Sequence, residues 1–207
     1  MIRVKICGIT SYEDAWAAVE AGADALGFIF VKGTPRYIEP EVASAIVAQM
    51  PPFVVTVGVF IDRTPEEIER IVSASGLSLA QLHGNETPGE CGRLRVPFVK
   101  VIRIQGEHSL ESLRIYPQAR AFLLDTYVAD RPGGTGTTFP WEIAAKAARQ
   151  ARVILSGGLT PDNVALAVTH VRPYAVDVCS GVETCPGRKD HHKMREFIEQ
   201  ARKADAR

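Results

Sequence analysis

Short apolar or β-branched runs alternate with longer segments of helical periodicity along the whole chain, and this alternation restricts the fold more than any other feature. Each strand-helix unit takes about 20 to 30 residues. Eight strands are predicted, at Ile2–Cys7, Ala25–Val31, Val54–Ile61, Leu79–His83, Phe98–Ile104, Ala121–Asp125, Val153–Ser156 and Ala175–Cys179. Because strands that are separated by helices pair in parallel, the sequence predicts a parallel α/β sheet.

The number of units selects among the α/β architectures. Eight strand-helix units within 207 residues fit a closed barrel at the small end of its size range, whereas an open doubly wound sheet uses fewer strands. No shift in composition and no linker divides the chain. The expected fold class is therefore α/β, a single (β/α)8 TIM barrel with a closed, parallel, eight-stranded sheet, and residues 1–207 are expected to form one domain.

Local signals place several of the helices. Ser11 precedes an acidic first turn, and Thr64 and Thr160 are each followed by proline, which is typical of a helix start. The segment Glu86–Arg95 contains one proline and two glycines, so its helix is expected to be short or irregular. The last helix, Asp190–Ala204, has one apolar stripe and is otherwise charged.

Composition excludes several classes of function. Hydrophobic residues make up 46% of the chain and charged residues 23%, which is typical of a globular protein and unlike a disordered one. The 24 Lys and Arg balance the 24 Asp and Glu, so neither nucleic acid nor an acidic membrane is expected as a partner. A small anion that is attracted by local charge is compatible with this balance.

Several expected absences follow from spacing. The longest apolar stretch, Pro51–Ile61, is far shorter than the roughly 18 residues that span a bilayer, so no transmembrane helix is expected. Arg3 and Lys5 interrupt what would have to be the apolar core of a signal peptide, which favours a cytoplasmic location. The cysteines form no C-x-x-C pair and no two histidines are four residues apart, so we predict no disulfide framework and no metal site.

The first candidate site residue ends the first strand. Alternation puts Lys5 and Cys7 on one face of this strand, directed into the barrel, with apolar residues on the other face. Asp177 has the same inward parity on the eighth strand, which closes against the first, so Lys5 and Asp177 are expected to form an ion pair. Cys7 is either an inert buried thiol or, because of its place at the catalytic rim, a reactive one.

A carboxylate and a glycine-rich loop follow the sixth strand. Asp125 ends this strand at the rim, where it either takes part in chemistry or accepts a hydrogen bond from a cap or loop. The stretch Asp130–Phe139 contains Gly134, Thr135 and Gly136 and is of a type that closes over a ligand.

Glycines also follow the last two strands. Gly157 and Gly158 come after the seventh strand, and Ser180 and Gly181 come after the eighth. Backbone N–H groups in such turns approach an anion closely, and barrels of this kind commonly bind a phosphate there. Simple tight turns are the alternative, but two of them on adjacent strands favour a phosphate. The expected partner is a small phosphorylated molecule.

Three further polar side chains are expected near the rim. Arg36, in the loop after the second strand, either binds a carboxylate through its planar guanidinium or is merely solvated. Gln81 and His83 share one face of the fourth strand and point into the barrel or to its rim. A structural role for His83 is as consistent with this placement as a catalytic one.

Motifs that carry these residues recur from one end of the chain to the other. They are Lys5-Ile6-Cys7-Gly8 with Thr10, Gly27-Phe28-Ile29-Phe30, Pro35-Arg36-Tyr37, Val57-Gly58-Val59-Phe60, Gln81-Leu82-His83-Gly84, Leu124-Asp125, Gly133-Gly134-Thr135-Gly136 with Phe139 and Trp141, Leu155-Ser156-Gly157-Gly158-Leu159, and Asp177-Val178-Cys179-Ser180-Gly181-Val182-Glu183. Together they resemble the phosphoribosylanthranilate isomerase family over essentially the whole chain. Cys179 stands where this family often has a small hydroxyl-bearing residue or alanine.

The resemblance implies an Amadori rearrangement that needs no cofactor. In this reaction N-(5-phosphoribosyl)anthranilate becomes 1-(2-carboxyphenylamino)-1-deoxyribulose 5-phosphate. Carried over by position, Asp125 is the general acid and Cys7 the general base, while Arg36 binds the anthranilate carboxylate. Further substrate contacts are expected at Gln81, His83, Gly134, Thr135 and Gly136, and phosphate contacts at Gly157, Gly158, Ser180 and Gly181. Because an ordinary thiol, with a pKa of about 8.5, is only a few per cent ionised at neutral pH, positive charge near Cys7 would help it to act as a base.

Two other functions stay open at this point. One is another phosphosugar isomerase on the same barrel, such as the aminoaldose isomerase of histidine biosynthesis, a family that uses two aspartates where this chain has Cys7 and Asp125. The other is a non-catalytic barrel that binds a phosphorylated ligand, which would keep the glycines but would not need the thiol and the carboxylate. The sequence is compatible with a monomer or a homodimer.

Overall fold

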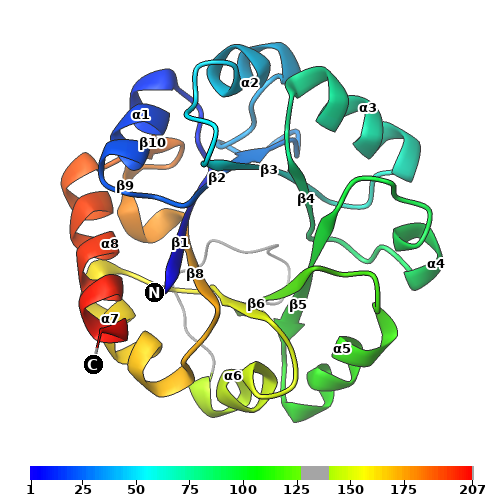
Figure 1. Cartoon of the computed structure of the whole chain (residues 1–207). Helices are drawn as coiled ribbons and strands as arrows, with labels where there is room; N and C mark the ends of the chain where they lie inside the picture. The colour runs from blue at the N-terminus through cyan, green and yellow to red at the C-terminus, as the bar shows by residue number, and fades with distance from the viewer. Residues whose placement is uncertain (127–139, 207) are drawn as a thin grey trace.

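The computed structural model describes residues 1–126 and 140–206, and these form a closed barrel of eight parallel strands. The strands are β1 (Arg3–Cys7), β2 (Ala25–Ile29), β3 (Val55–Phe60), β4 (Leu79–Leu82), β5 (Phe98–Ile104), β6 (Ala121–Thr126), β7 (Val153–Leu155) and β8 (Ala175–Val178). Each strand pairs with the next, and β8 closes the ring on β1 (Figure 1). The predicted (β/α)8 barrel is therefore confirmed.

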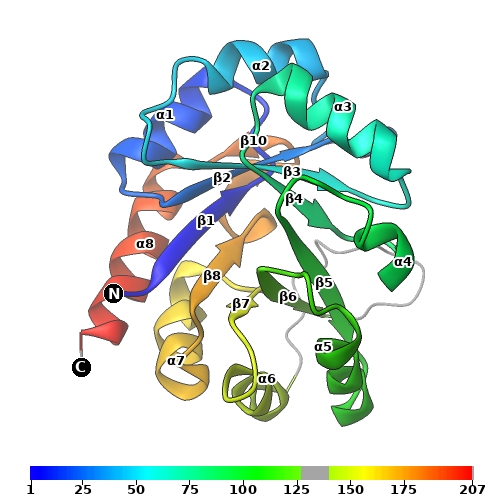
Figure 2. The same ribbon diagram turned by 45° about the vertical axis from the view of Figure 1, so that its right-hand side comes forward.

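Helices surround the ring and alternate with the strands, as the turned view in Figure 2 also shows. They are α1 (Tyr12–Glu20), α2 (Pro40–Val47), α3 (Pro65–Ser75), α4 (Pro88–Cys91), α5 (Ser112–Ile115), α6 (Trp141–Ala148), α7 (Pro161–Val171) and α8 (His191–Asp205), with the 3-10 turns η1 (Glu107–Glu111) and η2 (Ser180–Val182). A small antiparallel hairpin, β9 (Glu183–Cys185) and β10 (Arg188–Lys189), lies outside the barrel and was not predicted from the sequence.

The helix start signals have the predicted structural effect. The side chain of Ser11 accepts a hydrogen bond from the backbone N–H of Asp14 at the start of α1. Thr64 opens α3 with a reciprocal capping box, and at the start of α7 the side chain of Asn163 accepts a hydrogen bond from the backbone N–H of Thr160. Proline stands in the first turn of both helices. The irregular segment before β5 is reduced to the four-residue α4, as its proline and glycines predicted.

Five strands end earlier than predicted, whereas β6 ends one residue later, at Thr126. The bounds of β5 agree with the sequence analysis, but several other strands stop one or two residues earlier than predicted. Five residues that were predicted to end strands lie just beyond the observed strand ends: Val31, Ile61, His83, Ser156 and Cys179. All five line a pocket at the C-terminal mouth of the barrel. They leave the hydrogen-bonded ladder at the point where the strands spread to form that mouth.

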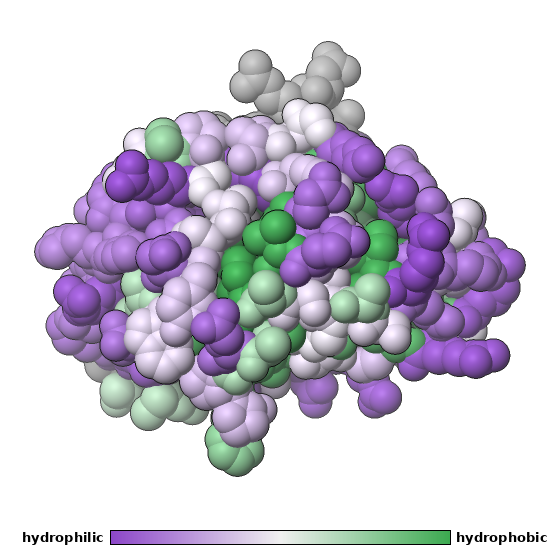
Figure 3. Space-filling view, turned by 90° about the horizontal axis from the view of Figure 1, so that it is seen from above, coloured by the Kyte–Doolittle hydropathy of each residue, from purple (hydrophilic) through white to green (hydrophobic). Residues whose placement is uncertain are grey.

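The hydrophobic core has two parts. The larger part fills the space between the sheet and the helices and includes Phe28 and Phe60 of the sheet and Phe197 of α8, all fully buried. A smaller cluster, with Val101 and Leu123, fills the barrel interior. Figure 3 looks onto the side of the molecule where α2 lies, and on this face hydrophilic side chains surround a hydrophobic area near its centre.

The chain ends meet at the start of the barrel. The amino group of Met1 lies 3.4 Å from a carboxylate oxygen of Asp205 in α8, and both views show the termini close together (Figures 1 and 2). Among the helices of residues 1–126 and 140–206, none combines the length and apolar character that crossing a membrane requires.

Candidate active site

A pocket opens at the C-terminal mouth of the barrel, where we expected the site. Nine of the predicted site residues lie in the described part of the chain, and all of them line this pocket: Cys7, Arg36, Gln81, His83, Asp125, Gly157, Gly158, Ser180 and Gly181. Apolar side chains at the ends of β2 and β3 form one wall, namely Ile29, Val31, Val59 and Ile61. The other predicted site residues, Gly134, Thr135 and Gly136, lie outside the described part of the chain.

The buried ion pair predicted between β1 and β8 is present. The Lys5 ammonium donates a hydrogen bond to Asp177 Oδ1 over 2.6 Å, and both side chains are about 6% exposed. Ser156 donates to the second oxygen of Asp177 over 3.2 Å. Burial disfavours the charged ammonium, but the adjacent groups Asp177 and Cys7 together outweigh this effect and raise the pKa of Lys5. Lys5 is therefore a fixed positive charge inside the barrel.

Cys7 lies directly beyond this ion pair and is nearly fully buried. A Cβ atom built on Gly27 would lie 2.7 Å from Cys7 Sγ and 3.0 Å from Lys5 Nζ, so the thiol and the ammonium occupy the same small space. A hydrogen bond from Cys179 and the charge of Lys5 lower the pKa of Cys7 to about 6, against the opposing effect of burial. The lowered pKa favours the thiolate, which is the form that can accept a proton.

Asp125 lies in the same pocket and has a histidine partner. Its Oδ1 accepts a hydrogen bond from the backbone N–H of Thr126 over 2.8 Å, and its Oδ2 lies 3.2 Å from His83 Nε2. Gln81 Nε2 lies 3.4 Å from His83 Nδ1. If Gln81 donates to Nδ1, the ring proton is on Nε2 and faces the Asp125 carboxylate. Asp125 and His83 are therefore hydrogen-bond partners at the edge of the pocket.

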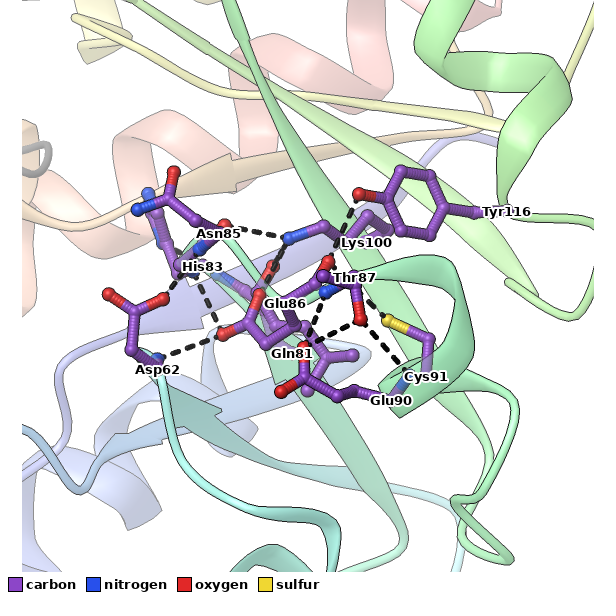
Figure 4. Close-up of polar contacts among 12 residues, drawn as sticks. Asp62, Gln81, His83, Asn85, Glu86, Thr87, Glu90, Cys91, Lys100 and Tyr116 are labelled. Atoms are coloured by element: carbon purple, nitrogen blue, oxygen red, sulfur yellow. Dashed lines mark hydrogen bonds and ion pairs between the residues drawn. The ribbon is translucent and has the colours of Figure 1, made fainter.

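A buried ion pair outside the barrel holds the loop that carries His83 (Figure 4). Lys100 of β5 donates to Glu86 Oε2 over 2.6 Å and to the carbonyl of Gly84 over 2.8 Å. Glu86 Oε1 in turn accepts the backbone N–H groups of Gly84 and Asp62, each over 3.1 Å. Because this network fixes the backbone next to His83, it fixes the direction of the imidazole toward Asp125.

Arg36 is held by an acidic partner that the sequence analysis did not predict. Its Nε and Nη2 donate to the two oxygens of Glu183 over 2.8 and 2.6 Å, a bidentate pair. Lys189 also donates to Glu183, over 3.0 Å. Although burial favours the protonated form, these contacts with Arg36 and Lys189 lower the pKa of Glu183. The pair orients Arg36 in the pocket and leaves three of its five N–H groups for a ligand.

The turns after β7 and β8 need their glycines for steric reasons. Gly157 and Gly158 have φ angles of +82° and +67°, which side chains rarely adopt. A Cβ atom on Gly157 would lie 2.7 Å from the backbone nitrogen of Thr126, and one on Gly181 would overlap the carbonyl oxygen of Leu159. The two backbones therefore run close to one another, and Gly157, Gly158, Ser180 and Gly181 all line the pocket.

The sequence analysis did not identify four residues that belong to the site. Glu183 and Lys189 pack around Arg36, and Ser156 and Cys179 line the pocket itself. Three of these four stand within or next to the quoted motifs, but nothing local in the sequence indicates that Arg36 pairs with a carboxylate 147 positions away. In residues 1–126 and 140–206, no group of three or more His, Cys, Asp or Glu side chains is placed to hold a metal ion.

A closed parallel barrel with a buried thiol, a carboxyl group and glycine turns at the C-terminal mouth defines a class: (β/α)8-barrel enzymes that move protons on a small anionic substrate. The comparisons with known proteins narrow this class. The model of the N-(5'-phosphoribosyl)anthranilate isomerase family matches residues 4–200. The chain belongs to this family.

Individual relatives agree with the family model. The N-(5'-phosphoribosyl)anthranilate isomerase of Geobacter sp. strain M21 is 52% identical over 203 residues, which are 98% of this chain and 99% of the relative. A solved structure of monomers generated from the dimeric Thermotoga maritima enzyme is 41% identical, with a TM-score of 0.89, and 98% of this chain matches all of that one. Another, solved in complex with reduced 1-(o-carboxyphenylamino)-1-deoxyribulose 5-phosphate, is 42% identical, with a TM-score of 0.89 and the same coverage. The chain is accordingly an isomerase of tryptophan biosynthesis.

Proposed function

We propose that Cys7 and Asp125 are the base and the acid of this isomerase, and that the substrate lies between them in the pocket. The observation that carries the proposal is their placement in one pocket, with a pKa of about 6 for Cys7. The reaction converts the aminoaldose N-(5-phosphoribosyl)anthranilate into the aminoketose 1-(2-carboxyphenylamino)-1-deoxyribulose 5-phosphate. It needs one proton delivered to an oxygen and one removed from a carbon, so one acid and one base suffice.

The acid acts first. Asp125 delivers a proton to the furanose ring oxygen as the bond between that oxygen and C1 breaks, and the nitrogen lone pair forms the C1=N bond of a Schiff base. To act as the acid, Asp125 carries this proton itself as a carboxylic acid, and its Oδ2 lies 3.2 Å from His83 Nε2. His83 is therefore proposed to act together with Asp125, and Gln81 to orient the imidazole through Nδ1.

The base acts on the Schiff base. The Cys7 thiolate removes the proton from C2, and the electron pair of that C–H bond forms the C1=C2 bond while the C1=N electrons return to nitrogen. The resulting enolamine takes up a proton from solvent at C1 and releases the hydroxyl proton at C2 to solvent, an exchange that leaves its number of protons unchanged and gives the ketone. The Lys5 ammonium, fixed by Asp177, favours the thiolate that begins this step.

Two anchors position the substrate on either side of the reacting carbons. The N–H groups of Arg36 that Glu183 does not use are directed to the anthranilate carboxylate, and the apolar wall that includes Val59 and Ile61 covers the aromatic ring. The backbone N–H groups of the Gly157-Gly158 and Ser180-Gly181 turns receive the phosphate. For Gly134, Thr135 and Gly136 we propose substrate contacts from the family resemblance alone.

A turnover assay on two aminoaldoses tests this function. Loss of anthranilate fluorescence with N-(5-phosphoribosyl)anthranilate should be fast, and inorganic phosphate should inhibit it competitively. The aminoaldose of the histidine pathway should react poorly, because that chemistry is associated with two aspartates rather than with a thiolate. Equal turnover of both substrates would contradict the assignment, and binding of either without turnover would support a non-catalytic barrel.

We propose a homodimer in the cytoplasm, with residues 1–207 as one domain. The dimeric Thermotoga relative supports the dimer, as does an apolar opening at the N-terminal end of the barrel, which is lined by Phe53, Val55 and Tyr174, exposed by 96%, 41% and 40%. The unpaired cysteines Cys7 and Cys179 fit a reducing compartment. Phe53→Glu should convert the dimer to monomers in analytical ultracentrifugation; a wild-type protein that sediments as a monomer would refute the dimer.

A further inference from the structure

We propose that Arg103 is a positioning residue for catalysis: its guanidinium holds the backbone carbonyl of His83 and thereby keeps the imidazole directed toward Asp125. The proposal rests on the proposed function in one respect, because it matters for turnover only if His83 acts together with Asp125. The contact itself concerns the free protein and can be tested without substrate.

Arg103 lies beside Asp125 at the mouth of the barrel. In the pairing of β5 with β6, Arg103 lies opposite Asp125. Two residues earlier on each strand, Val101 lies opposite Leu123, and this pair belongs to the cluster that fills the barrel interior. Because side chains alternate along a strand, Arg103 and Asp125 share the same inward face. Arg103 is thus a half-buried cation one strand away from the proposed acid.

The guanidinium of Arg103 is directed to the backbone of His83. Its Nη2 donates to the carbonyl of His83 over 2.8 Å. In residues 1–126 and 140–206, Arg103 forms no ion pair with the neighbouring Asp125, whose Oδ2 lies 3.2 Å from His83 Nε2. A guanidinium paired with Asp125 would favour its carboxylate form, which cannot deliver a proton. The contact with His83 therefore uses the cation without opposing the acid.

This contact lies just beyond the end of the ladder between β4 and β5. The last paired residues are Leu82 and Lys100, and β5 continues beyond this pair. The backbone N–H of His83 donates to the carbonyl of Phe60 in β3 over 2.8 Å. Its carbonyl accepts from the Arg103 side chain, which comes from β5. Arg103 thus extends the link between the two strands to the residue that carries the imidazole.

The residues on either side of His83 have a different anchor. Lys100 donates to the carbonyl of Gly84 over 2.8 Å and to that of Leu82 over 3.4 Å, as part of the buried network in Figure 4. Lys100 and Arg103 have opposite parity on β5, so the two cations reach the chain from the two faces of the sheet. Loss of the Arg103 side chain therefore releases the carbonyl of His83 but leaves the loop attached.

The imidazole is sensitive to such a release. Only two side-chain torsions separate its ring from the backbone. Its Nε2 lies 3.2 Å from Asp125 Oδ2, and its Nδ1 lies 3.4 Å from Gln81 Nε2, so a small rotation of the backbone lengthens both contacts beyond hydrogen-bond range. The described residues that line the pocket include His83 and Asp125 but not Arg103. Arg103 therefore acts through His83.

Two measurements on the full chain test the proposal. The first is the NMR spectrum of the His83 ring nitrogens in protein labelled with nitrogen-15 histidine, at about pH 8, where histidine side chains are ordinarily neutral. His83→Ala identifies the signals of this residue. The second measurement gives kcat and KM separately for N-(5-phosphoribosyl)anthranilate.

Three variants of arginine residues are compared with the wild-type protein. Arg103→Met removes the donors but keeps a long side chain, and Arg103→Lys keeps one charged donor. The matched control is Arg202→Met in α8. Arg202 is also half-buried and its Nη2 also donates to a backbone carbonyl, that of Gly22, over 2.5 Å, but it lies outside the pocket.

In the wild-type protein the two ring nitrogens of His83 should give the separate signals of one tautomer, since each nitrogen faces a fixed partner. In Arg103→Met these signals should move toward those of an imidazole that exchanges between tautomers. Its kcat should fall about 3- to 30-fold, with KM within about twofold of the wild-type value. Added to His83→Ala, Arg103→Met should lower kcat by less than about twofold further. Arg103→Lys should keep kcat within about threefold, and Arg202→Met should change neither measurement.

Several results would overturn the proposal. Unchanged His83 signals in Arg103→Met are one, and a full further loss of kcat when Arg103→Met is added to His83→Ala is another. A raised KM at unchanged kcat would mean that Arg103 binds the substrate itself. If Arg103→Met does not fold, Arg103→Lys decides, because exchanging His83 signals in that variant also overturn the proposal. Shifted His83 signals with an unchanged kcat leave the contact in place and refute the part of His83 in the proposed function.

Discussion

Replacing Lys5 with methionine should destabilise the protein strongly, because it leaves a carboxylate buried without its counter-charge. Lys5 and Asp177 are each 5% exposed, and their charged atoms are 2.6 Å apart. Removal of one partner of such a pair costs about 3 to 5 kcal/mol. The hydroxyl of Ser156, 3.2 Å from Asp177, is neutral and compensates for little of this loss. For a domain of this size the melting temperature should fall by roughly 6 to 20 °C.

The matched control is the double variant Lys5→Met with Asp177→Leu. An apolar pair of similar volume removes both charges, so most of the stability lost in Lys5→Met should return. Urea unfolding followed by circular dichroism gives the free energy of unfolding of the parent and the three variants, Asp177→Leu included. A loss below about 1 kcal/mol in Lys5→Met, which is the range of an exposed pair, would refute the reasoning.

Three further changes test other parts of the site. Gly158→Ala should raise KM about tenfold or more. The control is Gly76→Ala, at a similar φ of +65° in the C-cap of α3, which should cost only the backbone strain of about 1 kcal/mol and leave KM unchanged. An equal KM in the two variants would exclude Gly158 from the phosphate site. His83→Ala should lower kcat roughly 10- to 100-fold through Asp125, and an unchanged kcat would remove His83 from the acid pair. Because the pKa of Glu183 is lowered in the folded protein, this residue stabilises the fold at pH values above the pKa of Glu183 in the unfolded chain, and the contribution is lost as the pH falls. In Glu183→Gln the free energy of unfolding in urea should therefore depend less steeply on pH below about pH 5. An unchanged pH dependence would contradict this.

Periodicity predicted those parts of the molecule in which side-chain direction repeats. Alternation along β1 and β8 was sufficient to pair Lys5 with Asp177, because both lie inside regular strands of known parity. The same rule put Phe98–Ile104 in one strand with correct bounds. The sheet order follows from the alternation of strands and helices, since neighbouring parallel strands must be joined by a crossover.

Contacts between loops were outside the reach of this reasoning. Arg36 and Glu183 lie beyond the ends of β2 and β8, where no period fixes the direction of a side chain. The hairpin β9–β10 was missed for a related reason: its strands are three and two residues long, too short for alternation to be recognised. His83 was predicted at the rim, but its contact with Asp125 depends on the curvature of the barrel between β4 and β6.

The most direct test of the central claim is the kcat of Cys7→Ser measured beside that of the wild-type protein. Serine nearly preserves the shape of cysteine, but its hydroxyl stays protonated at neutral pH and cannot accept the C2 proton. Because Arg36 and the glycine turns are untouched, KM should change little, while kcat should fall by about 10²- to 10⁴-fold. A correctly folded Cys7→Ser protein with near-wild-type kcat would contradict the account and require another base at the mouth of the barrel.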